Sequence, residues 1–265
     1  ENPDIDIEKL QWERKQVIPA LERLYDEIWV YGLPQICDPL AEIALPGQVR
    51  RKMVYTGYLE REGARGAPHA EHAVPFDQPY LLVTPGGGGD GDAMVDWVLR
   101  AYESDASPPY PALLVFGPFM QQEKQQEFAR RVAQLKKVEA ITFEANIEPL
   151  IQGASGIVAM GGYNTFCEIL TFDKPALIIP RTVPRMEQFI RADRAQELGL
   201  VRMLEDDGVR NTRDMATALR HLPQQNRPSD IVVPGLLDGL PNVNRLARRL
   251  SGRTGRPIAA IAGQS

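Results

Sequence analysis

Two glycines at the end of an apolar segment are the residues of this chain best suited to bind an anion. Gly161 and Gly162 follow the apolar segment 156–160, and a helical pattern containing Asn164 and Thr165 comes next. Glycine lets the backbone approach a ligand closely, while the N–H groups and the positive dipole end of a helix attract negative charge. These residues predict an anion site at the beginning of the helix.

The same helix start has a second explanation that requires no ligand. Thr165 and Glu168 have the spacing of a capping box, in which each side chain accepts a hydrogen bond from the backbone N–H of the other residue. In that case both polar side chains serve only the end of the helix. The two explanations stay open at this point.

A second glycine cluster follows the apolar segment 81–85. Gly86, Gly88 and Gly91 satisfy the pattern G-x-G-x-x-G, which makes a dinucleotide-binding oxidoreductase a rival interpretation. That motif also requires an acidic residue after the next strand, to bind the ribose hydroxyls. The next predicted strand, 111–116, is followed by Gly-Pro-Phe and no carboxylate. The pattern therefore argues against a dinucleotide site.

Two carboxylates accompany this second cluster. Asp90 and Asp92 would repel a bare diphosphate, so we expect them to cap the following helix or to contact an acceptor. A tight turn that binds no ligand is the remaining alternative for the cluster.

The elements that must position these turns form an alternating series of strands and helices. Short apolar segments suited to buried strands are separated by amphipathic helical patterns, which predicts βαβ units and a parallel sheet. The predicted strands are 81–85, 111–116, 137–143, 156–160 and 176–179.

Three separated sequence blocks resemble the donor half of the family 28 glycosyltransferases. They read G-G-x-N-T-x-x-E from Gly161, K-P-A-L-I-I-P from Lys174 and R-x-E-Q-x-x-R from Arg185. The resemblance extends from about residue 25 to about residue 250. It implies a GT-B fold, an α/β architecture with two doubly wound parallel sheets. The second, donor-binding domain would be complete and the first would be truncated.

The resemblance also implies a domain organisation. Residues 1–58 would be the C-terminal remnant of the acceptor-side domain, and residues 59–79 would be the linker. The nucleotide-sugar donor-binding domain would cover 80–223. A closing segment and helix at 224–250 and a flexible tail at 251–265 would complete the chain.

Site roles follow from the resemblance as expectations. The Glu168 carboxylate would accept both ribose hydroxyls of the donor, and Glu187 and Gln188 would contact the donor sugar. Phe143 and Glu144 would lie at the base, and Arg185 and Arg191 are candidate phosphate partners. The residues expected to bind the donor diphosphate are Gly88, Gly89, Gly161, Gly162, Asn164 and Thr165. The catalytic base is unknown, and the resemblance places it in the absent N-terminal part.

Composition restricts the partners and the compartment. A net charge of −5 argues against nucleic acid, whose backbone requires a basic protein surface. The only two cysteines, Cys37 and Cys167, lie far apart without metal-like spacing, which suits the reducing cytoplasm. We expect no cofactor, no metal site and a cytoplasmic protein. Contact with a membrane surface stays open.

The function implied is transfer of a sugar from a nucleoside diphosphate, expected to be UDP, to an acceptor hydroxyl. The acceptor is either lipid-linked or a small molecule. Two alternatives stay open: a non-catalytic donor-binding subunit that needs a partner, and a nucleotide-sugar epimerase or hydrolase of the same fold.

Overall fold

The structure is a computed structural model of the chain. It describes residues 15–38, 40–41, 43–61, 76–87, 89–144, 146–183 and 186–254. The chain divides into two compact units, and each is considered by itself. The first unit includes Arg61–Val232, and the second comprises the described parts of Ile5–Glu60 and Val233–Ser265.

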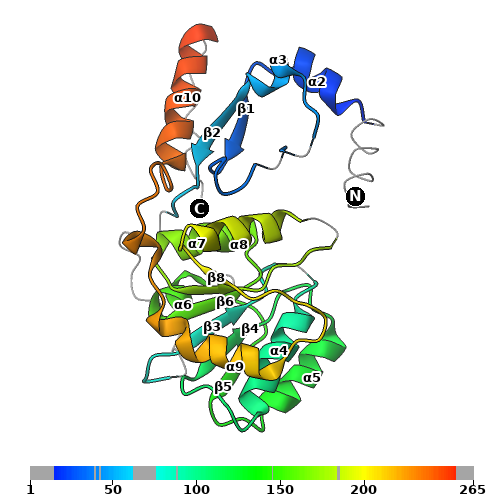
Figure 1. The fold of residues 1–265 in the computed structure, drawn as a ribbon, viewed down its shortest axis with the longest axis vertical. Coiled ribbons are helices and arrows are strands. Elements are labelled where there is room, and N and C mark those ends of the chain that lie inside the picture. Colours follow the sequence, from blue (N-terminus) through cyan, green and yellow to red (C-terminus); the bar gives the residue numbers. More distant parts are fainter. Residues whose placement is uncertain are drawn as a thin grey trace. The chain divides into compact units, whose positions relative to one another are not determined.

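A six-stranded, entirely parallel sheet forms the centre of the first unit (Figure 1). Its order is β5-β4-β3-β6-β7-β8. The parallel sheet predicted from the alternating pattern is thus confirmed. The strands are β3 (Leu81–Thr84), β4 (Ala112–Val115), β5 (Val138–Ile141), β6 (Gly156–Ala159), β7 (Ala176–Ile178) and β8 (Arg202–Met203).

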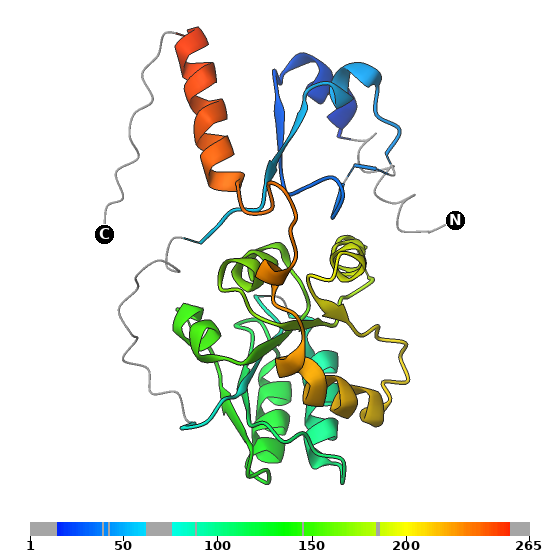
Figure 2. The ribbon, with the colours of Figure 1, turned by 60° about the vertical axis from the view of Figure 1, so that its left-hand side comes forward.

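Helices cover both faces of this sheet, as Figures 1 and 2 show. One face carries α4 (Asp92–Glu103), α5 (Gln122–Val132) and α9 (Thr212–His221). The other carries α6 (Glu148–Gly153), α7 (Tyr163–Thr171) and α8 (Glu187–Glu197), and the short 3-10 helices η2 (Leu222–Gln224) and η3 (Pro228–Asp230) follow α9. A sheet covered on both faces needs apolar side chains on both, which explains the unbroken apolar segments of the sequence.

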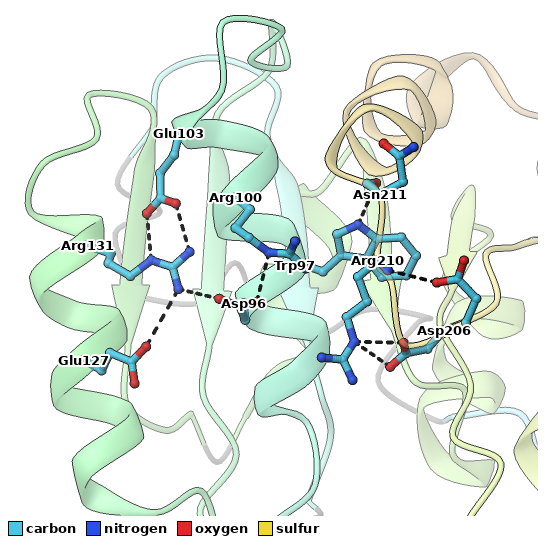
Figure 3. Close-up of polar contacts among 10 residues, drawn as sticks. Asp96, Trp97, Arg100, Glu103, Glu127, Arg131, Asp206, Arg210 and Asn211 are labelled. Atoms are coloured by element: carbon cyan, nitrogen blue, oxygen red, sulfur yellow. Dashed lines mark hydrogen bonds and ion pairs between the residues drawn. The ribbon is translucent and has the colours of Figure 1, made fainter.

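The main core lies between the sheet and the α4, α5 and α9 face. Alternate strand residues such as Leu81 and Val83 point into it, because side chains alternate between the two faces of a strand. Trp97 is its largest fully buried side chain, and its indole Nε1 donates a hydrogen bond to the Asn211 carbonyl over 2.9 Å (Figure 3). This bond links α4 to the beginning of α9.

An ion-pair network covers the outside of the same face (Figure 3). Arg131 of α5 donates to both Glu103 oxygens and to Asp96, at 2.7–2.9 Å. The network therefore joins α5 to α4 at two positions, Asp96 and Glu103.

Asn211 caps α9, and this cap has a measurable contribution. Its side-chain oxygen accepts a hydrogen bond from the Arg213 N–H over 2.9 Å. Asn211→Ala is expected to lower the free energy of unfolding by about 1 kcal/mol. Asn211→Asp, which keeps the acceptor, should stay close to the wild type in the same urea titration. Equal losses in both variants would contradict the capping role.

The second unit contains a two-stranded parallel sheet, β1 (Ile28–Tyr31) and β2 (Met53–Gly57). It also holds α2 (Val17–Arg23), α3 (Gly47–Arg50) and α10 (Gly239–Thr254), and α10 packs on β2. At Gly57, φ is +89°, and an added Cβ would lie 2.4 Å from the Gly235 carbonyl oxygen. The backbone therefore crosses itself closely just before α10 begins.

Candidate functional site

The two glycine clusters follow adjacent strands, β3 and β6, at the point where the strand order of the parallel sheet reverses. β3 and β6 are neighbours, with Thr84 paired to Ala159. The chain leaves β3 toward β4 on one side and leaves β6 toward β7 on the other. Loops that diverge in this way open a crevice at the carboxyl ends of the strands, the usual ligand site of doubly wound sheets.

The turn after β6 has the geometry of an anion site. Gly161 has φ +77°, and an added Cβ would lie 2.7 Å from the Ile178 Cγ2 methyl. α7 begins at Tyr163, and Gly162 is its N-cap residue, with no side-chain capping bond. The N–H groups of the first turn therefore keep their capacity to bind an anion.

The capping-box explanation for Thr165 and Glu168 is wrong. Because α7 begins at Tyr163, Thr165 is its third residue and cannot be the N-cap. Asn164 is the second helical residue, and its side chain is exposed.

The turn after β3 faces the turn after β6. Gly86 has φ +82°, and an added Cβ there would lie 3.7 Å from the Thr165 hydroxyl oxygen. An added Cβ on Gly89 would lie 3.1 Å from the Phe119 carbonyl oxygen. Gly88 lies outside the described residues. The structure therefore places Gly86 beside the start of α7, and Gly89 beside Phe119 in the loop after β4.

Asp90 pairs with an arginine instead of capping α4. The N-cap of α4 is Gly91, which makes no side-chain capping bond, so the expectation of a cap is wrong. Asp90 Oδ2 accepts a hydrogen bond from Arg181 Nη1 over 2.5 Å. Arg181 follows β7, so this ion pair connects the loops after β3 and β7.

Glu168 lies within α7 with a largely buried side chain. Only 15% of the side chain is exposed, and its Oε1 lies 3.6 Å from Arg61 Nη2. Burial raises the pKa of the Glu168 carboxyl, the positive charge of Arg61 opposes this rise, and Glu148 adds to it. Arg61 also donates its backbone N–H to the Thr171 hydroxyl over 3.2 Å. A carboxylate held in this way is a strong hydrogen-bond acceptor.

Glu187 and Gln188 are the first two residues of α8. Gln188 Oε1 accepts the Arg181 backbone N–H over 3.3 Å, and its Nε2 would lie 4.0 Å from a Cβ added to Gly162. The Gln188 amide therefore lies between the loop after β7 and the start of α7. Glu187 forms an ion pair with Arg191, one turn further along α8.

Arg191 is buried behind the turn after β6. Its side chain is 4% exposed, and Nη1 donates to the Gly161 carbonyl over 2.9 Å. Arg185, the other candidate phosphate partner, lies outside the described residues.

Phe143 and Glu144 lie further along the same edge of the sheet. They follow β5, which is two strands from β3 in the sheet order. Phe143 is 57% exposed, and Glu144 Oε1 accepts the Asn146 N–H over 2.9 Å. An exposed aromatic ring beside backbone polar groups suits a flat heterocycle.

Sequence reasoning missed Arg61. It belongs to a charged, glycine-rich stretch in which one arginine carries no distinguishing pattern, and its partner Glu168 is far away in sequence. In the described part of the chain, no cluster of three or more His, Cys, Asp or Glu residues is arranged to hold a metal ion. None of the described helices is both long and apolar enough to span a bilayer.

Comparison with known proteins identifies the family of this chain. Residues 83–228 match the glycosyltransferase family 28 C-terminal domain, which covers more than half of the chain. The chain therefore belongs to glycosyltransferase family 28. Two Methanosarcina proteins described as uncharacterized glycosyltransferases are similar to it. The M. mazei protein is 28% identical over 153 residues, 58% of this chain and 37% of that protein. The M. acetivorans protein is 27% identical over 157 residues, 59% of this chain and 38% of that protein.

Solved structures share the fold at low sequence identity. MurG of Acinetobacter baumannii has a TM-score of 0.56 at 13% identity, with 87% of this chain and 62% of that chain covered. CalG4, a calicheamicin glycosyltransferase, has a TM-score of 0.55 at 19% identity, with 81% and 51% covered. The predicted GT-B fold is thus confirmed. The chain spans little more than a third of the curated relatives that it matches and about half of CalG4.

Proposed function

We propose that this chain binds a nucleoside diphosphate sugar and takes part in transferring the sugar to an acceptor hydroxyl. One observation carries the proposal: two glycine turns face each other at the reversal point of the sheet, beside a helix start without a side-chain cap. A diphosphate provides the negative charge that such backbone N–H groups bind.

The residue roles in this proposal are those that the resemblance to the family implies. The diphosphate lies over Gly161, Gly162, Asn164 and Thr165, and Gly88 and Gly89 also bind it. Glu168 accepts the two ribose hydroxyls, since an ionised carboxylate has two acceptor oxygens. Glu187 and Gln188 contact the sugar. Phe143 and Glu144 border the base.

The proposed reaction exchanges one bond to the anomeric carbon for another. The acceptor hydroxyl oxygen attacks that carbon, the bond to the diphosphate oxygen breaks, and the hydroxyl proton passes to a base. Negative charge grows on the departing nucleoside diphosphate. The N–H groups at the start of α7 stabilise this charge where it develops.

The two units receive separate roles in this proposal. The unit that includes Arg61–Val232 binds the donor, and the residues before the linker belong to an acceptor-side domain. We take the base to be uracil, so that the donor is a UDP-sugar, and the acceptor to be a lipid-linked or small-molecule alcohol. The protein acts in the cytoplasm, with or without contact to a membrane surface.

A thermal-shift panel tests the donor site. UDP, GDP, TDP, ADP and NAD are added at equal concentration, because a ligand of the native state raises the melting temperature. A selective rise with one nucleoside diphosphate is the expected result, and UDP is the expected ligand. A rise with NAD alone would favour the dinucleotide interpretation. No rise with any of the five would contradict the donor-site proposal.

A further inference from the structure

We infer that Arg191 is a positioning residue of the donor site. It fixes the position of the diphosphate-binding turn relative to the sugar-contacting Glu187, and it does not touch the ligand itself. This inference rests on the proposed function and adds to it the residue that connects two of its subsites.

Arg191 contacts two residues of the proposed site, Gly161 and Glu187, and also Tyr163, the first residue of α7. Its Nη1 donates to the Gly161 carbonyl over 2.9 Å, and its Nη2 donates to Glu187 Oε1. Its guanidinium carbon lies 5.9 Å from the centre of the Tyr163 ring. With 4% of the side chain exposed, Arg191 is enclosed by the turn after β6 and the start of α8. Arg191 can therefore influence the site through these neighbouring residues, without contact with the ligand.

The bond to Gly161 determines the direction of the neighbouring N–H. The Gly161 carbonyl and the Gly162 N–H belong to one planar peptide unit, and in a trans peptide they point in opposite directions. Holding the carbonyl toward Arg191 therefore directs the Gly162 N–H away from it. Glycine at φ +77° has several alternative conformations, so this turn needs such a restraint.

The bond to Glu187 reduces the repulsion between the Glu187 carboxylate and a bound diphosphate. A carboxylate at the sugar subsite stands close to a dianionic diphosphate, and like charges repel. Arg191 neutralises Glu187, whose side chain stays 48% exposed for contact with a ligand. The buried cation is in turn compensated by this carboxylate and by the carbonyl, as a buried charge requires.

Arginine suits this role better than lysine does. The planar guanidinium presents donors in a fixed fork, so one side chain can hold a carbonyl and a carboxylate in defined directions. An ammonium group is a single charge without this geometry. Arg191→Lys would keep the positive charge beside Glu187 but would lose the defined hydrogen bonds that position Gly161 and Glu187.

The experiment compares diphosphate and monophosphate binding. Affinities of UDP and UMP, and of the GDP, TDP and ADP pairs, are measured by calorimetry for the wild type, Arg191→Met and Arg191→Lys. Arg131→Met is the matched control, since Arg131 is also paired with carboxylates (Figure 3) but lies on α5, which covers the opposite face of the sheet from α8 (Figure 1).

The expected result is a selective loss at the diphosphate. Arg191→Met should raise the Kd of the best-bound nucleoside diphosphate about tenfold, as expected for a lost interaction with a charged group. The Kd of the matching monophosphate should rise less, so that the preference for the diphosphate falls. Arg191→Lys should lose part of the same preference. Arg131→Met should lower the melting temperature but keep both affinities.

Three outcomes would overturn the inference. If Arg191→Met keeps the diphosphate preference, or weakens both ligands equally, Arg191 has only a structural role and the proposed function stands. If Arg191→Met does not fold, wild-type preference in Arg191→Lys leads to the same conclusion. If the wild type binds none of the nucleotides, the proposed function fails and the inference fails with it.

Discussion

Glu168→Gln is expected to weaken nucleoside diphosphate binding by about ten- to a hundredfold, the range for hydrogen bonds to a charged acceptor. The ionised carboxylate offers an acceptor to each of the two ribose hydroxyls. Glutamine has one acceptor oxygen and presents an NH2 group to the other hydroxyl. Calorimetric titration with the best-bound nucleoside diphosphate measures the change.

The same substitution should have little effect on stability, with a defined pH dependence. Burial raises the pKa of Glu168, so the folded protein binds this proton more tightly than the unfolded chain does. Protonated Glu168 therefore contributes its full stabilisation at pH values below its pKa in the unfolded chain. This stabilisation is lost as the pH rises through its pKa in the folded protein. The variant lacks this decline. Its melting temperature should equal that of the wild type in acid and match or exceed it at neutral pH.

Glu103→Gln is the control for both measurements. Glu103 is also paired with an arginine (Figure 3), but it lies on α4, which covers the opposite face of the sheet from α7 (Figure 1). It should leave the nucleotide affinity unchanged. A large stability loss in Glu168→Gln with unchanged affinity would show that Glu168 is a structural residue.

Gly161→Ala is expected to affect both folding and binding. Alanine at φ +77° costs about 1–2 kcal/mol. Its Cβ would also lie 2.7 Å from Ile178 Cγ2, and such overpacking adds about 1–3 kcal/mol. The strain falls on the peptide that carries the proposed anion-binding N–H. Urea unfolding should show the combined loss, and nucleotide binding should fall below detection.

Gly208→Ala separates strain from crowding. Gly208 has φ +78°, almost the same conformation, but an added Cβ there would meet no heavy atom within 4 Å. This variant should lose only the conformational part of the stability and should bind nucleotide normally. If Gly161→Ala were no worse than Gly208→Ala, the close packing against Ile178 would have no energetic role.

The fold was largely predictable because its determinants are local. Apolar segments flanked by glycine and proline indicated buried strands, and their alternation with helical patterns indicated a parallel sheet. The start of α7 was less predictable, because Gly162 and Thr165 are both acceptable N-cap residues by local sequence. Contacts from distant residues, Arg191 on Gly161 and Ile178 beside it, accompany the earlier start.

The partners of the site carboxylates were the least predictable part. Asp90, Glu168 and Glu187 each pair with an arginine. The partners of Asp90 and Glu168 come from other loops of the unit. No sequence periodicity connects such residues, and the folded backbone alone brings them together. Helical spacing does connect Glu187 with Arg191, but it does not reveal that Arg191 also reaches Gly161.

The strand order has a consequence for folding. β3, β4 and β5 follow one another in sequence, as do β6, β7 and β8, so the strands of each group pair through a single helical crossover. Only the contact between β3 and β6 joins strands that are remote in the chain, as Leu81 and Gly156 are. Such closure is slow relative to local pairing. The crevice between β3 and β6 forms only when these two strands pair. A ligand bound there would therefore stabilise the paired state of β3 and β6.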